Sequence, residues 1–146
     1  MNDLHRAREC ARVMYDADRA SRELGIEIDV PAPGEATAIM AVTASMLNGY
    51  SVCHGGNLFT LADTAFAVAC NAYNDVTVAA GASIEFVRPA REGDRLTAVA
   101  CERHRRGRTG IYDVDVTNQR GERVALFRGR SFATGESMLP GTPQKD

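Results

Sequence analysis

The residue whose surroundings are hardest to explain without chemistry is an aspartate in the most apolar part of the chain. Asp63 lies within LFTLADTAFAVACNAY, residues 58–73, a stretch without Gly or Pro that is apolar on nearly every helical face. A helix of that kind is central and buried. Because an unpaired carboxylate there costs several kcal/mol, Asp63 must have a partner or face an interface or cleft. It therefore either braces a nearby loop or performs acid, base or nucleophilic chemistry.

A glycine pair directly precedes this helix. In His54-Gly55-Gly56 the glycines let a ligand or another backbone approach closely. The free N–H groups and the dipole at a helix start favour an anion or a developing oxyanion. If the helix starts near Gly55, Asp63 lies about 12 Å further along its axis. One chain therefore cannot easily flank one reacting atom with both, whereas two antiparallel helices across a twofold axis could, which predicts at least a dimer.

A basic run forms the third candidate site. Arg103-His104-Arg105-Arg106-Gly107-Arg108-Thr109-Gly110 lies between two predicted strands, and Arg88 and Arg91 flank Pro89. Residues 81–146 carry a net charge of +3 and residues 1–80 one of −5. This asymmetry favours an anionic ligand on the C-terminal half, and arginine forks suit phosphate. A solvated charged hairpin explains the run equally well.

The remaining candidates are weaker. Cys53 beside His54 suggests a Cys-His nucleophile, but adjacent side chains usually diverge. His5 and His104 are isolated, no residue set has metal-ligand spacing, and no nucleotide-binding glycine motif occurs. We therefore expect no metal and no cofactor.

The elements that must position these residues follow from hydrophobic periodicity. Helical spacing predicts an amphipathic helix over residues 3–23 that stops at Gly25. Strands are predicted at 37–43, 76–87, 96–104, 112–117 and 123–134, with the central helix at 58–73. Short connections imply an antiparallel sheet, and one apolar helix covers it economically. The prediction is an α+β fold in which a curved sheet wraps one long helix, with an extra N-terminal helix.

Length and composition agree with one domain. A chain of 146 residues with 45% apolar residues can bury a full core, and we assign the domain to residues 1–136 and a flexible tail to 137–146. No window approaches the roughly 20 apolar residues of a membrane span. The net charge of −2 argues against a nucleic-acid binder. A charged N-terminus without a visible signal peptide, and four scattered cysteines, predict a cytoplasmic protein with reduced thiols.

A spaced set of motifs runs through residues 37–132. It comprises Asn48-Gly49, His54-Gly55-Gly56, Leu58-Phe59, residues 61–66, Ile84-Glu85-Phe86 with Arg88-Pro89, Gly107-Arg108-Thr109-Gly110, Tyr112-Asp113 and residues 125–129. This set strongly resembles the PaaI-type hotdog-fold acyl-CoA thioesterases of phenylacetate catabolism. His-Gly-Gly alone is generic to hotdog proteins, whereas the complete set is much more specific.

The resemblance implies roles for individual residues. Asp63 corresponds to the family's catalytic carboxylate, and Asn48, His54, Gly55 and Gly56 correspond to the segments that line the thioester. The family also implies dimers with sites shared between subunits, commonly paired into homotetramers. One departure concerns a hydroxyl residue that some relatives carry early in the strand after the helix, where this chain has Ala79. Another group, such as Thr64, must then orient water.

We therefore expect an acyl-CoA thioesterase that acts on phenylacetyl-CoA or hydroxyphenylacetyl-CoA-like thioesters. A backbone N–H of Gly55 or Gly56 would polarise the carbonyl, and Asp63 would act as nucleophile or general base. The coenzyme A phosphates are assigned to Arg88, Arg105, Arg106, Arg108, Thr109 and Gly110. The acyl pocket is assigned, without ranking, to Phe59, Phe66, Tyr73 or neighbours from another subunit.

Two alternatives remain open. A hotdog hydratase or dehydratase would use His54 and Asp63 as an acid–base pair, and the glycine pair argues against it because it suits an oxyanion site. A non-catalytic acyl-CoA sensor would gain nothing from a costly buried acid, although a fold never guarantees chemistry.

Overall fold

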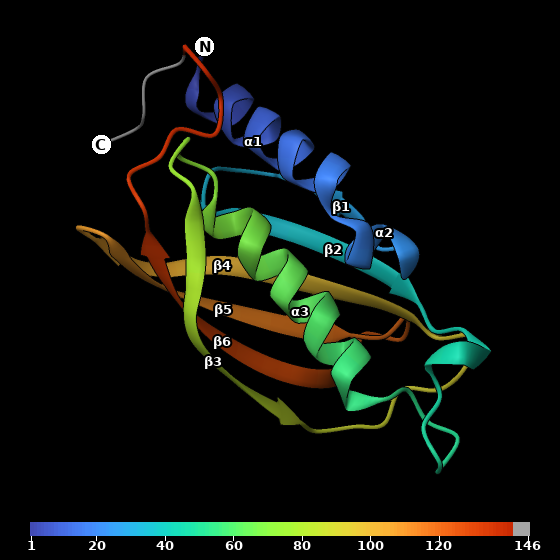
Figure 1. The fold of residues 1–146 in the computed structure, drawn as a ribbon. Coiled ribbons are helices and arrows are strands. Elements are labelled where there is room, and N and C mark those ends of the chain that lie inside the picture. The colour runs from blue at the N-terminus through green and yellow to red at the C-terminus, as the bar shows by residue number, and fades with distance from the viewer. Residues whose placement is uncertain (142–146) are drawn as a thin grey trace.

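The chain folds as one curved sheet around one long helix (Figure 1). The computed structural model describes residues 1–141. The helices are α1 (Asp3–Ala17), α2 (Arg19–Glu23) and α3 (Gly55–Cys70), with a short 3₁₀ turn, η1 (Ala44–Met46). The strands are β1 (Glu27–Asp29), β2 (Glu35–Ala41), β3 (Thr77–Phe86), β4 (Arg95–Arg106), β5 (Thr109–Thr117) and β6 (Arg123–Ala133).

All strand pairs are antiparallel, and the order across the sheet is β1-β2-β4-β5-β6-β3. Strands β1 and β3 are therefore the two edges. The β3–β6 register shifts between Ala79 and Gly81, and Arg130 donates to the Ala80 carbonyl at this bulge, over 3.2 Å. The predicted α+β hotdog architecture is confirmed.

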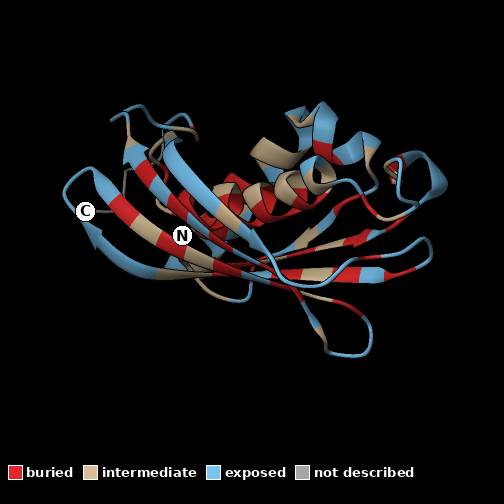
Figure 2. Cartoon of the chain, turned by 90° about the horizontal axis from the view of Figure 1, so that it is seen from below, coloured by how far each residue is buried: buried red, intermediate tan, exposed pale blue. Residues whose placement is uncertain are grey.

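The core lies between α3 and the concave face of the sheet (Figure 2). Phe66 on α3 is almost fully buried and makes edge contacts with Tyr112 of β5, at a ring separation of 5.7 Å. Gly129 of β6 permits this approach, because a Cβ there would lie 2.7 Å from the Phe66 ring. Small residues at such positions set how closely the helix can approach the sheet.

The N-terminal helix differs from the prediction because Asp18 divides it. Asp18 has non-helical backbone angles, and its carboxylate accepts the backbone N–H of Ser21 as the N-cap of α2. Aspartate is a preferred residue at that position, so the sequence carries its own break. Strand β1 was not predicted, since three residues are too few for a period-2 pattern.

The central helix also begins and ends earlier than predicted. It starts at Gly55 because His54 caps it, although the first turn, Gly-Gly-Asn, has no apolar periodicity. It stops at Cys70, where Asn71 donates from its side chain to the Ala67 carbonyl and the chain turns through Asn74, whose φ is +56°.

The C-terminal segment after β6 crosses the end of α3. Backbone N–H groups of Met138 and Leu139 donate to the side-chain oxygen of Asn74, and Leu139 is buried. Met138 and Leu139 of the predicted tail therefore contact the domain, and residues 142–146 lie outside the described residues. Within residues 1–141, no helix combines the length and apolar character needed to cross a membrane.

Candidate active site

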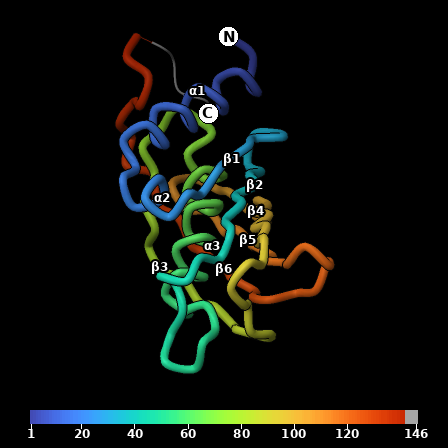
Figure 3. Tube along the Cα trace, turned by 90° about the vertical axis from the view of Figure 1, so that its right-hand side faces the viewer, coloured from blue at the N-terminus to red at the C-terminus, as the bar shows by residue number. Residues whose placement is uncertain are grey.

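The loop over residues 47–54 precedes α3 and places the start of this helix at the surface. It projects beyond the sheet at the lower end of Figure 3, in teal. The side-chain oxygen of Asn48 accepts the backbone N–H groups of Tyr50 and Val52, over 2.9 and 3.3 Å, and holds the loop closed. The amide Nδ2 of Asn48 has no hydrogen-bond acceptor among residues 1–141, so it remains available as a donor.

His54 uses its ring to cap α3. The ring Nδ1 accepts the backbone N–H of Gly56 over 3.0 Å, which requires Nδ1 to be unprotonated. The Gly55 N–H has no acceptor among the described residues, since the first N–H groups of a helix lack partners within it. Of the two glycines, Gly55 is therefore the better oxyanion donor, and His54 has a clear role in shaping the turn.

A groove of about 390 Å³ opens beside Gly55. Its lining is mostly apolar: Asn48, Val52, Cys53, Gly55, Leu58, Phe86, Val87, Arg88 and Pro89. Phe86 lies closest to the glycine, because a Cβ added to Gly55 would be 3.0 Å from its ring. The groove thus combines a free N–H, an amide, an apolar wall and one guanidinium, from two separate segments, residues 48–58 and 86–89.

Asp63 lies on the face of α3 that the sheet does not cover. Its side chain is half-buried, as are those of Thr60 and Ala67, one turn before and after it. Burial raises the pKa of Asp63 above its ordinary value, and the negative charge of Asp18 raises it further. No described residue donates a hydrogen bond or an ion pair to its carboxylate, so it does not brace a loop.

Thr64 is occupied by internal contacts. Its hydroxyl donates to the Thr60 carbonyl over 2.7 Å and lies 2.8 Å from the Ser21 hydroxyl, and the residue is buried. These bonds give the predicted water-orienting role no support from within one chain.

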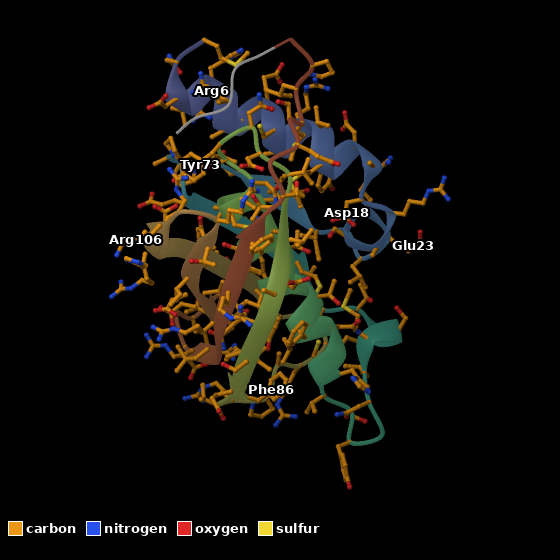
Figure 4. The ribbon with its side chains drawn as sticks, turned by 60° about the vertical axis from the view of Figure 1, so that its left-hand side comes forward. Arg6, Asp18, Glu23, Tyr73, Phe86 and Arg106 are labelled. Carbon is orange, nitrogen blue, oxygen red and sulfur yellow. The ribbon has the colours of Figure 1, made fainter. Side chains whose placement is uncertain are left out.

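The predicted phosphate-binding residues divide between two ends of the molecule. Arg88 lines the Gly55 groove, where it also forms an ion pair with Glu122 at 3.3 Å. Arg105, Arg108 and Thr109 line a cavity of about 190 Å³ at the C-terminal end of α3. Figure 4 shows Phe86 and Tyr73, which mark these two sites, at opposite ends, and Arg106 pointing away from the protein.

The cavity at the C-terminal end has its own contacts. Arg105 stacks on the Tyr73 ring at 3.7 Å, and Arg108 donates to the Ala133 carbonyl over 3.0 Å. Gly110 is buried, and a Cβ there would lie 2.8 Å from the Ser131 hydroxyl, so its importance is for packing. The threonine hydroxyl of Thr109 donates to the Arg106 carbonyl over 3.2 Å.

A Cys-His nucleophile is not favoured by this geometry. Burial raises the pKa of Cys53 to about 11, so the thiol is protonated at neutral pH. Among residues 1–141 no three His, Cys, Asp or Glu side chains are grouped as metal ligands.

Sequence reasoning missed Phe86 and named three other aromatic residues for the acyl pocket. Phe59 and Phe66 pack against Phe127 in the core, and the Tyr73 hydroxyl donates to Glu102 over 2.7 Å. Phe86 is 53% exposed on the groove instead. Its position two residues before Arg88-Pro89, inside a motif already singled out, was the available signal.

The fold and the groove at the helix start define a class of protein, and sequence comparison agrees with it. The model of the Thioesterase superfamily matches residues 50–125, and the chain belongs to this superfamily. It is 49% identical to acyl-coenzyme A thioesterase PaaI of Escherichia coli K12, over 90% of this chain and 94% of that protein.

Solved structures give the same result. The structure of the E. coli PaaI protein, from the phenylacetic acid degradation operon, superposes with a TM-score of 0.91 at 47% identity, over 93% of this chain and 99% of that one. A hypothetical thioesterase from Streptococcus pneumoniae, solved with coenzyme A, gives a TM-score of 0.73 at 31% identity over 77% and 90%. The resemblance drawn from the motifs is confirmed.

Proposed function

We propose that this thioesterase hydrolyses aryl acyl-CoA thioesters, of the phenylacetyl-CoA or hydroxyphenylacetyl-CoA kind, to the free acid and coenzyme A during phenylacetate degradation. The observation that carries the proposal is the groove in which the unpaired Gly55 N–H lies beside an exposed phenylalanine. The similarity to acyl-coenzyme A thioesterase PaaI supports the substrate class. The four free cysteines are typical of a reducing compartment, which supports a cytoplasmic location.

The thioester carbonyl would bind at the helix start. The Gly55 N–H and the Asn48 Nδ2 are available donors in the same groove, and the helix dipole adds to their field. One such donor stabilises a tetrahedral oxyanion by about 3–4 kcal/mol. The apolar side of the groove, with Phe86 and Leu58, would hold the aryl group.

Asp63 would supply the second half of the reaction. The raised pKa of Asp63 makes it a stronger base at neutral pH, which supports deprotonation of a water, and direct nucleophilic attack is the alternative. In the base mechanism the water oxygen attacks the carbonyl, the proton passes to Asp63, and coenzyme A thiolate leaves and is then protonated. A single turnover in heavy-oxygen water separates the mechanisms, because only nucleophilic attack places label in the Asp63 carboxylate.

The edge strand β3 supports assembly of the site from two chains. Its ten residues include one charged residue, Glu85, and none of them is fully buried. Exposed edges of this length are normally blocked by charge, proline or pairing, so we propose that β3 pairs with β3 of a second copy. A twofold axis there would bring the uncovered face of α3, with Asp63, toward the partner's helix start. Two such dimers would form the homotetramer.

The same pairing of β3 strands would bring together the arginines that lie at opposite ends of one chain. Antiparallel β3 strands would bring Thr77 of one chain, which lines the cavity of Arg105 and Arg108, toward Phe86 of the other. The bound thioester would then have arginines from both chains on one side, within reach of the coenzyme A phosphates. These are Arg88 of one chain and Arg105, Arg106 and Arg108 of the other. Alanine at Arg88 or Arg108 is expected to raise KM for acyl-CoA, whereas alanine at Arg95 is the control.

Thiol release across a panel of acyl-CoAs tests the function. We expect phenylacetyl-CoA to release thiol and Asp63→Asn to lose about 10²–10⁴-fold in kcat. Hydration of an enoyl-CoA without thiol release would favour the hydratase, and tight binding without turnover would favour the sensor. Near-normal hydrolysis by Asp63→Asn would overturn the assignment of Asp63.

A further inference from the structure

A chain of buried hydroxyl groups connects the α1–α2 junction to the middle of α3. The Asp18 carboxylate accepts both the backbone N–H of Ser21, over 3.0 Å, and its hydroxyl, over 2.6 Å. The Ser21 hydroxyl gives its one proton to Asp18, so it accepts in its 2.8 Å contact with the Thr64 hydroxyl, and Thr64 shares its proton between Ser21 and the Thr60 carbonyl. Ser21 and Thr64 are 1% and 7% exposed, so this is an interior link.

The link ends on α3 one residue after Asp63, which carries the carboxylate of the proposed reaction. Thr64 directly follows Asp63, and Thr60 lies on the uncovered face of α3 one turn before it. Figure 4 shows Asp18 at the junction of the two N-terminal helices. Because Ser21 satisfies both carboxylate oxygens, the Asp18 side chain is fixed in one position. A capping residue that served only α2, a helix of five residues, would not need a buried connection to α3.

The charges around Asp63 are few. Among the charged side chains of residues 1–141, Asp18 is the one whose charge raises the pKa of Asp63, and the Cys70 thiol on α3 stays neutral because burial raises the pKa of Cys70 to about 12. Two arginines of the N-terminal helices have acidic or carbonyl partners within that segment: Arg12 pairs with Glu9 and Asp16, and Arg22 donates to the Asp16 carbonyl. No strand residue among those described forms an ion pair with it.

We propose that Asp18 is a positioning residue for the hydrolysis, which the Ser21–Thr64 link holds against the catalytic helix as a fixed second negative charge beside Asp63. The proposal rests on the proposed role of Asp63. A like charge favours the protonated form of a neighbouring carboxyl and so makes its ionised form a stronger base. The N-terminal helices thereby contribute to catalysis without contacting the substrate.

The pH profile of kcat/KM tests this proposal. In Asp18→Asn the neutral amide still caps α2, because Asn and Asp are equally good caps. Without the charge, Asp63 ionises at lower pH, so the acid limb moves to lower pH and the ratio of kcat/KM at acidic pH to that at neutral pH rises severalfold. Asp18→Ser, a second neutral cap, should behave alike, and Asp18→Glu should restore the wild-type profile. Asp16→Asn, two residues away on the exposed surface, is the matched control and should change nothing.

Carbon-13 titration of the Asp63 carboxyl, assigned with Asp63→Asn, gives a readout independent of turnover. The proposal predicts a lower midpoint in Asp18→Asn and Asp18→Ser than in wild type. If both variants keep the wild-type midpoint and acid limb while Asp63→Asn is inactive, the role of Asp18 is wrong and the proposed function stands. If Asp63→Asn stays active, the function of Asp63 itself fails. A shift that also occurs in Asp16→Asn would contradict a specific role for Asp18.

Discussion

At the scale of single residues, the site depends on groups that the fold leaves without partners. The Gly55 N–H and the Asp63 carboxylate both lack hydrogen-bond partners among the described residues, although polar groups at such positions are usually paired. His54, by contrast, is engaged in capping α3. A hydrolytic site requires a free donor that stabilises the oxyanion and a free base that activates water.

The cost of keeping Asp63 charged should be measurable. Its pKa is raised in the folded state, so the folded protein loses stability as pH rises from the ordinary aspartate range through that raised value. Asp63→Asn removes this loss. We expect the free energy of unfolding of Asp63→Asn to exceed that of wild type at neutral pH and to approach it below the ordinary aspartate pKa. Urea unfolding of both proteins at the same protein concentration measures this difference. A variant less stable than wild type at neutral pH would show that Asp63 is stabilised by a partner.

At the scale of elements, the position of α3 depends on close contacts with the sheet. A Cβ at Gly129 would overlap the Phe66 ring. Gly129→Ala should therefore destabilise the protein by about 1–3 kcal/mol, as overpacked cores do, in denaturant unfolding. Gly49→Ala is the control, since a Cβ at Gly49 meets nothing within 4 Å. Equal stability of the two variants would mean that α3 packs further from β6.

The same scale shows how far the sequence predicts the fold. Strand β5 follows from strict alternation and the body of α3 from a continuous apolar run, and both signals are local. The break at Asp18 and the helix start at Gly55 depend on single capping side chains, so periodicity misses them. Arg88 and Arg105 line different cavities because of the order of the strands in the sheet, and no local sequence pattern encodes that order.

At the scale of the whole molecule, the exposed β3 edge predicts an oligomer. Ala82 lies exposed in the middle of β3, so Ala82→Lys would place two like charges near a twofold axis. We expect this variant to shift toward a 15.8 kDa monomer by light scattering and to lose thiol release. Ala41→Lys, on the exposed end of β2, should leave both unchanged. A wild-type mass and activity for Ala82→Lys would contradict pairing through β3.

The central claim is that Asp63 of one protomer acts with Gly55 of its partner. Gly55→Pro removes the proposed donor at the first helical position, where the helix needs no N–H although the Phe86 ring must shift, and Asp63→Asn removes the base. Each variant alone should be inactive. Mixed under conditions that exchange subunits, they should recover about a quarter of wild-type thiol release, since half of the dimers are mixed and each mixed dimer has one intact site. If verified subunit exchange restores no activity, both groups act within one chain and the shared site is wrong.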